Sequence, residues 1–185
     1  MTERTVGVIV GSVSTNSINR RLADALAELA PRAGLEFVDI EIAQLPYYGT
    51  QYDEDYPVEG AAYKAALNGV DGLLLVTPEY NRSIPAVLKN AIDWATRPSG
   101  ESIFPHKPVG VIGASDGDLS TAVAQTHLKS ILTSQGAALV GEPEAYIHFT
   151  DGYLDDEGAV AEEADVAFLL EFLEALRDQI ARFVP

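Results

Sequence analysis

The sequence predicts an α/β fold in three layers, in which one parallel, five-stranded sheet lies between two layers of helices. Short apolar runs such as GLLLV at 72–76 alternate along the chain with segments whose apolar residues recur at helical spacing. A continuous apolar run is typical of a strand that is buried on both faces. Regular alternation of strand and helix favours a parallel sheet, and right-handed crossovers leave few topologies for it.

Five strand–helix units follow one another along the chain. The predicted strands are 5–10, 35–42, 72–76, 108–113 and a fifth within 138–149 that is broken near 141–143. The predicted helices are 18–29, 58–68, 85–95, 120–134 and a long last helix with an apolar stripe of Leu169, Phe172, Leu173, Leu176 and Ile180. Pro85 suits the first helical position, and Gly136 suits a C-cap.

The whole chain, residues 1–185, is expected to form a single domain. A length of 185 residues suits one sizeable core, and the chain contains no internal repeat, low-complexity tract or linker. A long loop at 45–57 and an acidic turn at 151–158 are the longest interruptions of the strand–helix pattern.

The composition excludes several kinds of chemistry. The chain has no cysteine, which excludes disulfides, thiolate nucleophiles and cysteine-ligated metal clusters. Its three histidines, His106, His127 and His148, show no close ligand spacing, so no metal site is predicted. Redox chemistry in this protein therefore requires an organic cofactor.

The charge also restricts the partners of the protein. A formal net charge of −16 argues against nucleic acid and anionic membranes, because both attract clusters of Lys and Arg. No apolar run approaches membrane-spanning length, and the N-terminal residues lack the pattern of a signal peptide. We therefore expect a cytoplasmic protein.

A polar loop follows the first predicted strand, at the start of a helix. Free N–H groups and the helix dipole favour a phosphate there, although Ser and Asn are also common helix caps. The loop lacks the glycine patterns of dinucleotide folds and of P-loops, which favours a mononucleotide. Its polar residues are Ser12, Ser14, Thr15, Asn16, Ser17 and Asn19.

The loop after the third strand has the composition of a ligand site. Pro78 and Pro85 restrict its backbone, and Glu79, Tyr80 and Asn81 offer polar contacts of different kinds. Loops at the carboxyl ends of parallel strands are the usual ligand sites of open α/β sheets. A purely structural role for Tyr80, as a packed loop aromatic, leaves the two prolines and the neighbouring polar groups unexplained.

The segment TPEYNRSIPAVLKNAIDW at 77–94 resembles the flavodoxin-like NAD(P)H-dependent FMN reductases, a family that includes quinone, azo-dye and chromate reductases. The resemblance extends to the first loop at 11–20, to LPYY at 45–48 and to AQTHLK at 124–129. It implies a doubly wound, flavodoxin-like sheet of strand order 2-1-3-4-5, with FMN where strands 1 and 3 diverge.

The resemblance also implies an activity. FMN is the expected cofactor, and NADPH or NADH the expected electron donor. The expected partner is a small-molecule electron acceptor, namely a quinone, an azo compound, free flavin or a metal oxyanion, reduced by a ping-pong hydride transfer. A homodimer is expected, with a homotetramer as the alternative. No catalytic acid or base is assigned, because the flavin accepts hydride directly.

Three loops are expected to bind the cofactor. Arginine usually occupies the position of Ser14 in the family; Arg20 and Arg21 could replace that cation or could be solvated helix charges. Ser120 and Val123 also depart from the family pattern. The predicted cofactor-binding residues are Ser12, Ser14, Ser17, Ile18 and Asn19 for the phosphate, Pro78, Glu79, Tyr80 and Asn81 for the ring, and Ser115, Asp116 and Gly117 for its pyrimidine end.

Two other functions remain open at this point: a flavodoxin-type electron carrier, and an α/β interaction protein without a flavin. The tyrosines of the loop at 45–57 also have two interpretations. They could form a wall of the substrate pocket at a subunit boundary, together with Trp94, or they could fix a surface loop.

Overall fold

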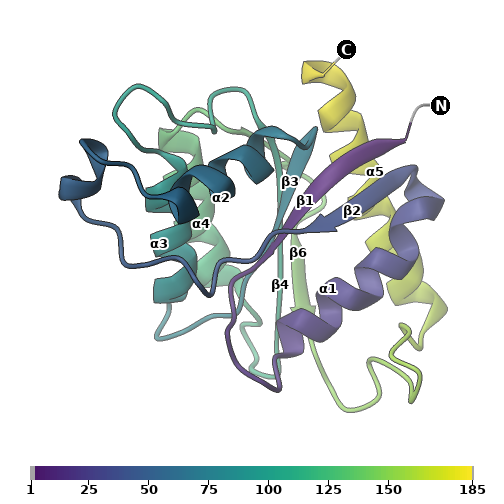
Figure 1. Cartoon of the computed structure of the whole chain (residues 1–185). Coiled ribbons are helices and arrows are strands. Elements are labelled where there is room, and N and C mark those ends of the chain that lie inside the picture. The colour runs from purple at the N-terminus through teal and green to yellow at the C-terminus, as the bar shows by residue number, and fades with distance from the viewer. Residues whose placement is uncertain (1–2, 185) are drawn as a thin grey trace.

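The computed structural model describes residues 3–184 and has the predicted three-layer α/β architecture (Figure 1). Residues 1, 2 and 185 of the predicted domain lie outside the described residues. The sheet order is β2-β1-β3-β4-β5, with β6 also paired to β4, and all of these pairings are parallel, which confirms the predicted order. The strands are β1 (Arg4–Val10), β2 (Leu35–Asp39), β3 (Gly72–Val76), β4 (Pro108–Ser115), β5 (Ala138–Leu139) and β6 (Ala145–His148).

Helices cover both faces of the sheet. α1 and α5 lie on one face, and α2, α3 and α4 lie on the other (Figure 1). The helices are α1 (Ile18–Leu29), α2 (Val58–Asn68), α3 (Ala86–Ala95), α4 (Ala122–Ser134) and α5 (Glu163–Phe183), with short 3₁₀ turns at Ala30–Ala33 and Thr50–Asp53.

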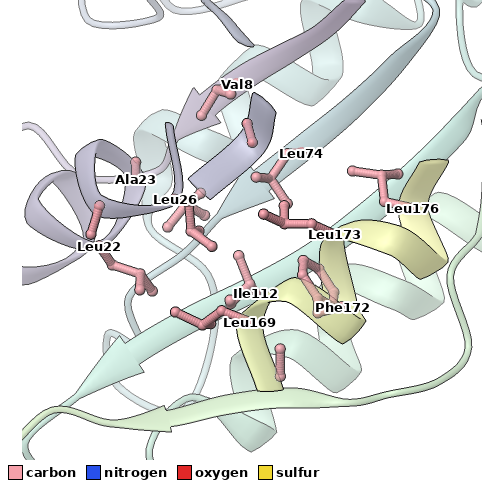
Figure 2. Close-up of a cluster of buried hydrophobic side chains, with 14 of the residues drawn as sticks. Val8, Leu22, Ala23, Leu26, Leu74, Ile112, Leu169, Phe172, Leu173 and Leu176 are labelled. Atoms are coloured by element: carbon pink, nitrogen blue, oxygen red, sulfur yellow. The ribbon is translucent and has the colours of Figure 1, made fainter. Parts of the chain in front are cut away.

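The core has one half on each side of the sheet. All five residues of β3 are buried; Leu74 points toward α1 and α5, whereas Leu73 and Leu75 point toward the other helices. Figure 2 shows the first half, in which Leu22, Leu26, Leu169, Phe172 and Leu173 of the two helices meet Val8, Leu74 and Ile112 of the strands. Burial on both faces explains why the strands are continuous apolar runs.

Several element boundaries differ from the predicted ones. The fifth strand is indeed broken, into β5 and β6, whereas β2 ends three residues early, at Asp39. α4 begins at Ala122 and not at Ser120, because Ser120 has φ +48°, outside the right-handed helical region. Pro85 is the N-cap of α3, with ψ 148°, one residue before the predicted position.

Candidate functional site

Three polar loops meet at the carboxyl edge of the sheet. Val10, Val76 and Ile112, near the ends of β1, β3 and β4, are direct neighbours in register. The hydrogen bonds continue past them, from Gly11 N–H to the Val76 carbonyl (2.8 Å) and from Thr77 N–H to the Ile112 carbonyl (2.9 Å). The chain segments that leave these strands therefore start side by side.

The first loop ends at the N-terminus of α1. Ser17 is the N-cap, and its Oγ accepts a hydrogen bond from Arg20 N–H at 3.1 Å. Ser12 Oγ accepts a hydrogen bond from Ser14 N–H at 3.3 Å. Among residues 3–184, neither hydroxyl donates to a protein acceptor, so both can donate to an anionic ligand.

Asn19 has a structural role that the sequence did not reveal. Its side chain is buried, donates from Nδ2 to the Ala114 carbonyl at 2.9 Å, and accepts from Ala114 N–H at 2.9 Å. These two bonds fix the first turn of α1 to the end of β4. Each polar atom of the carboxamide therefore already has a partner within the protein.

The loop after β3 folds into a tight hairpin. Tyr80 and Ser83 exchange two backbone hydrogen bonds of 2.9 and 3.0 Å. The two residues between them, Asn81 and Arg82, have φ values of +50° and +63°, the pattern of a type I′ turn. The hairpin leaves the Tyr80 side chain half exposed beside the other two loops.

Glu79 connects this hairpin to α4. Its side chain is only 6% exposed; Oε2 accepts from the N–H groups of Val123 (3.1 Å) and Ala124 (3.0 Å), and Oε1 lies 2.9 Å from the Arg82 guanidinium. Burial favours the neutral carboxyl, but these hydrogen bonds and the charge of Arg82 outweigh it, so the pKa of Glu79 is lowered. Glu79 therefore caps a helix 44 residues further along the chain.

The loop after β4 is the third polar loop at the carboxyl edge of the sheet. Ser115 Oγ accepts from Gly117 N–H at 3.1 Å, and Ser120 N–H donates to the Gly117 carbonyl at 2.8 Å. These bonds curl the loop back toward the start of α4 and leave Asp116 exposed.

A cavity of about 240 Å³ lies between the three loops; we call it the flavin cavity, after the cofactor that the sequence predicts there. It brings together ten of the twelve predicted cofactor-binding residues, while Asn81 and Gly117 lie outside its lining. Asn16 and Ala114 also line it. The ten are Ser12, Ser14, Ser17, Ile18, Asn19, Pro78, Glu79, Tyr80, Ser115 and Asp116.

Neither arginine of α1 lines the flavin cavity. Arg20 pairs with Asp39 at 2.9 Å, and the Arg21 guanidinium lies over the Phe149 ring at 5.2 Å. Neither arginine therefore supplies a cation to the lining of the flavin cavity.

The long loop before α2 is fixed by an aromatic cluster. Tyr48, Tyr52 and Tyr56 each have a ring centroid 5.3 Å from that of Trp94, which is fully buried. Trp94 is thus a core residue, and its suggested place at a subunit boundary is wrong. Tyr47 is 82% exposed and does not belong to this cluster.

The chemistry of the flavin cavity fits FMN. Two serine hydroxyls and the free N–H groups at the start of α1 can hold a phosphate, and the hairpin offers a proline, an aromatic ring and backbone groups to a flat ring system. Within residues 3–184, no group of three or more His, Asp or Glu residues could hold a metal. No helix in that part of the chain is both long and apolar enough to span a membrane.

Known proteins are similar to this chain over most of its length. Residues 4–152 match the family "NADPH-dependent FMN reductase". The chain is 43% identical over 169 residues to a 2-hydroxy-1,4-benzoquinone reductase from Burkholderia sp, with 91% of this chain and 92% of the relative covered. It is 36% identical over 180 residues to a quinone reductase from Pseudomonas putida, with 97% and 94% covered.

A solved structure is similar over almost the whole chain. FerB, a flavoenzyme NAD(P)H:(acceptor) oxidoreductase from Paracoccus denitrificans, superposes with a TM-score of 0.92 at 39% identity and covers 97% of this chain and 98% of its own. A family match over more than half of the chain and relatives of this similarity decide against the electron carrier and the interaction protein. The chain belongs to the family of NADPH-dependent FMN reductases.

Proposed function

We propose that the protein binds FMN in the flavin cavity and reduces a quinone with NADH or NADPH. The observation that carries this proposal is the meeting of the first loop and the Tyr80 hairpin at one cavity, where a phosphate site adjoins a site for a flat ring. The name of the Pseudomonas relative supports a quinone as the acceptor, and the name of the Burkholderia relative supports a benzoquinone.

In this proposal, the residues of the protein bind FMN and orient it. Ser12, Ser14 and the first turn of α1 would hold the phosphate, and Pro78, Tyr80 and Asp116 would border the ring. Bound FMN supplies hydride transfer from the nicotinamide to the acceptor. Overall, NADH, one proton and the quinone give NAD⁺ and the hydroquinone, and the proton comes from solvent, since no side chain is assigned as an acid.

We propose a ping-pong reaction because the donor and the acceptor would use the same open side of the cavity in turn. Initial rates with NADH and p-benzoquinone should give parallel lines in double-reciprocal plots at several fixed quinone concentrations. Intersecting lines would contradict the shared site. Azo dyes, free FMN and chromate are further candidate acceptors, and the same assay ranks them by kcat/KM.

Three further proposals concern the protein as a whole. Residues 1–185 would form one domain, which would work in the cytoplasm, where its nicotinamide donors are made and used. A homodimer, with a homotetramer as the alternative, is supported by the exposed apolar side chains of Val13 and Tyr47, which are 62% and 82% exposed. Sedimentation velocity of the FMN-loaded protein distinguishes these states from a monomer.

A further inference from the structure

A second cavity, of about 230 Å³, adjoins the flavin cavity, and we call it the β2-side cavity. The two cavities share Ser12 and Ser14, so they meet across the first loop. The proposed roles of the flavin cavity leave this second space without an occupant. A ligand that reaches from one cavity to the other must pass over Ser12 and Ser14.

The walls of the β2-side cavity are partly apolar. Val10, Ile40 and Ile42 are buried residues of its lining, and Val13 is an exposed apolar residue on the first loop. Such walls suit a flat heterocycle, since most small-molecule sites combine apolar surfaces with a few polar groups.

Acidic side chains surround the cation that lines this cavity. Arg20 is the one cation of the described lining, and its guanidinium lies 2.9 Å from Asp39, 3.8 Å from Glu41 and 3.9 Å from Asp24. One positive charge among three carboxylates leaves the region negative. The Glu41 side chain lines the cavity and is 68% exposed, so its carboxylate can accept hydrogen bonds from a ligand.

This combination favours a nucleoside with free ribose hydroxyls. In dinucleotide-binding α/β folds, an acidic residue at the end of the second strand accepts a hydrogen bond from the ribose 2′-hydroxyl of NAD. Asp39 ends β2, the strand that neighbours β1, and Glu41 lies two residues beyond that end. A 2′-phosphate, with a charge of about −1.5 to −2 at pH 7, would instead meet carboxylates and a cation of the described lining, Arg20, that is already paired.

We propose that the β2-side cavity binds the adenosine ribose of the electron donor and that Glu41 makes the protein prefer NADH to NADPH. The proposal extends the function given above, since it concerns the donor of that reaction. Glu41 acts here as a specificity-determining residue, through a hydrogen bond to the 2′-hydroxyl and repulsion of a 2′-phosphate.

Isothermal titration of FMN-saturated protein with 5′-AMP and with 2′,5′-ADP tests this binding without turnover. FMN saturation keeps both probes out of the flavin cavity. Wild type should bind 5′-AMP at least about tenfold more tightly than 2′,5′-ADP, since a doubly charged phosphate approaches partly exposed carboxylates. Glu41→Gln should reduce the ratio, and Glu41→Lys should invert it.

Glu171→Lys on α5 is the matched control, because it makes the same change of net charge at an exposed site on another element. It should leave the ratio of the two affinities as in wild type. Equal affinities in wild type, or a ratio that Glu41→Lys leaves unchanged, would overturn the proposal, provided that circular dichroism shows the variant folded.

The proposed function and this inference can fail separately. If the FMN-loaded protein oxidises neither NADH nor NADPH in the presence of p-benzoquinone, the proposed function fails, and the two affinities still decide the role of Glu41. If both donors are oxidised with equal kcat/KM and wild type binds both probes equally, only the inference fails.

Discussion

Asn19 joins the first loop to the end of β4 through two buried hydrogen bonds to Ala114. Asn19→Asp replaces the donating Nδ2 with an oxygen that faces the Ala114 carbonyl. We expect the free energy of unfolding to fall by about 2–4 kcal/mol, because a buried carbonyl loses its donor and meets a negative charge. Urea unfolding, followed by circular dichroism, measures this loss.

Gln51→Glu is the control for Asn19→Asp, since it makes the same amide-to-acid change at an exposed position. Its free energy of unfolding should stay within about 0.5 kcal/mol of wild type. An unchanged urea midpoint for Asn19→Asp would mean that the two hydrogen bonds do not contribute to stability.

Glu79 should make stability depend on pH. Its pKa in the unfolded chain is the ordinary 4.5, and in the folded protein it is lower, so its contribution is complete above the ordinary value and is lost as pH falls through the folded value. We expect Glu79→Gln to cost about 1–2 kcal/mol near neutral pH. The difference from wild type should shrink as the pH falls below about 4.5.

Urea unfolding at several pH values measures this difference, with the exposed Glu171→Gln as the control for removing one carboxylate. If the difference in free energy of unfolding between wild type and Glu79→Gln stays constant or grows on acidification, the negative charge of Glu79 does not contribute to stability.

At the scale of elements, the Tyr80–Ser83 hairpin depends on two residues with positive φ. Asn81 is exposed, so its substitution tests the backbone more than the contacts. We expect Asn81→Gly to be neutral or slightly stabilising, and Asn81→Val to cost about 1–3 kcal/mol, since a β-branched residue is strained at φ +50°.

Thermal unfolding of the two Asn81 variants measures the difference, and the FMN dissociation constant shows whether the hairpin shapes the cavity. Val at this position should weaken FMN binding, whereas Gly should preserve it. Equal stability of the two variants would contradict the type I′ turn.

The strands could be predicted from the sequence because burial on both faces requires continuous apolar runs, as in β3. The hairpin could not be predicted from the sequence. Asparagine, as at Asn81, is common at positive φ, but arginine, as at Arg82, is not. The contact of Glu79 with α4 could not be predicted either, since it joins residues 44 positions apart and depends on where α4 begins. That start, at Ala122, follows from the positive φ of Ser120, a residue that fits an ordinary helix start equally well.

For the molecule as a whole, strand–helix alternation predicted the layers, whereas the strand order came from the family resemblance, since alternation alone permits several orders. The same holds for the site. Residue types in the first loop predicted a phosphate site, while the placement of Ser115 and Asp116 beside it depends on long-range pairing of β4.

The net charge of −16 should slow the approach of an anionic donor. Added salt should therefore speed the association of NADPH at low ionic strength, because the Debye length falls from about 30 Å at 0.01 M to about 10 Å at 0.1 M. Stopped-flow measurement of the association rate constant tests this, with a neutral quinone as the control. Association that slows steadily with salt would show that a local positive field dominates.

The most direct test of the central claim is an anaerobic titration of the protein after it has been loaded with FMN and desalted. The visible absorption band of the flavin should be retained through desalting and should be bleached promptly by NADH, with NADPH slower. A retained band that neither donor bleaches would contradict the reductase function and favour an electron carrier. Loss of the band on desalting would contradict the proposal that FMN binds in the flavin cavity.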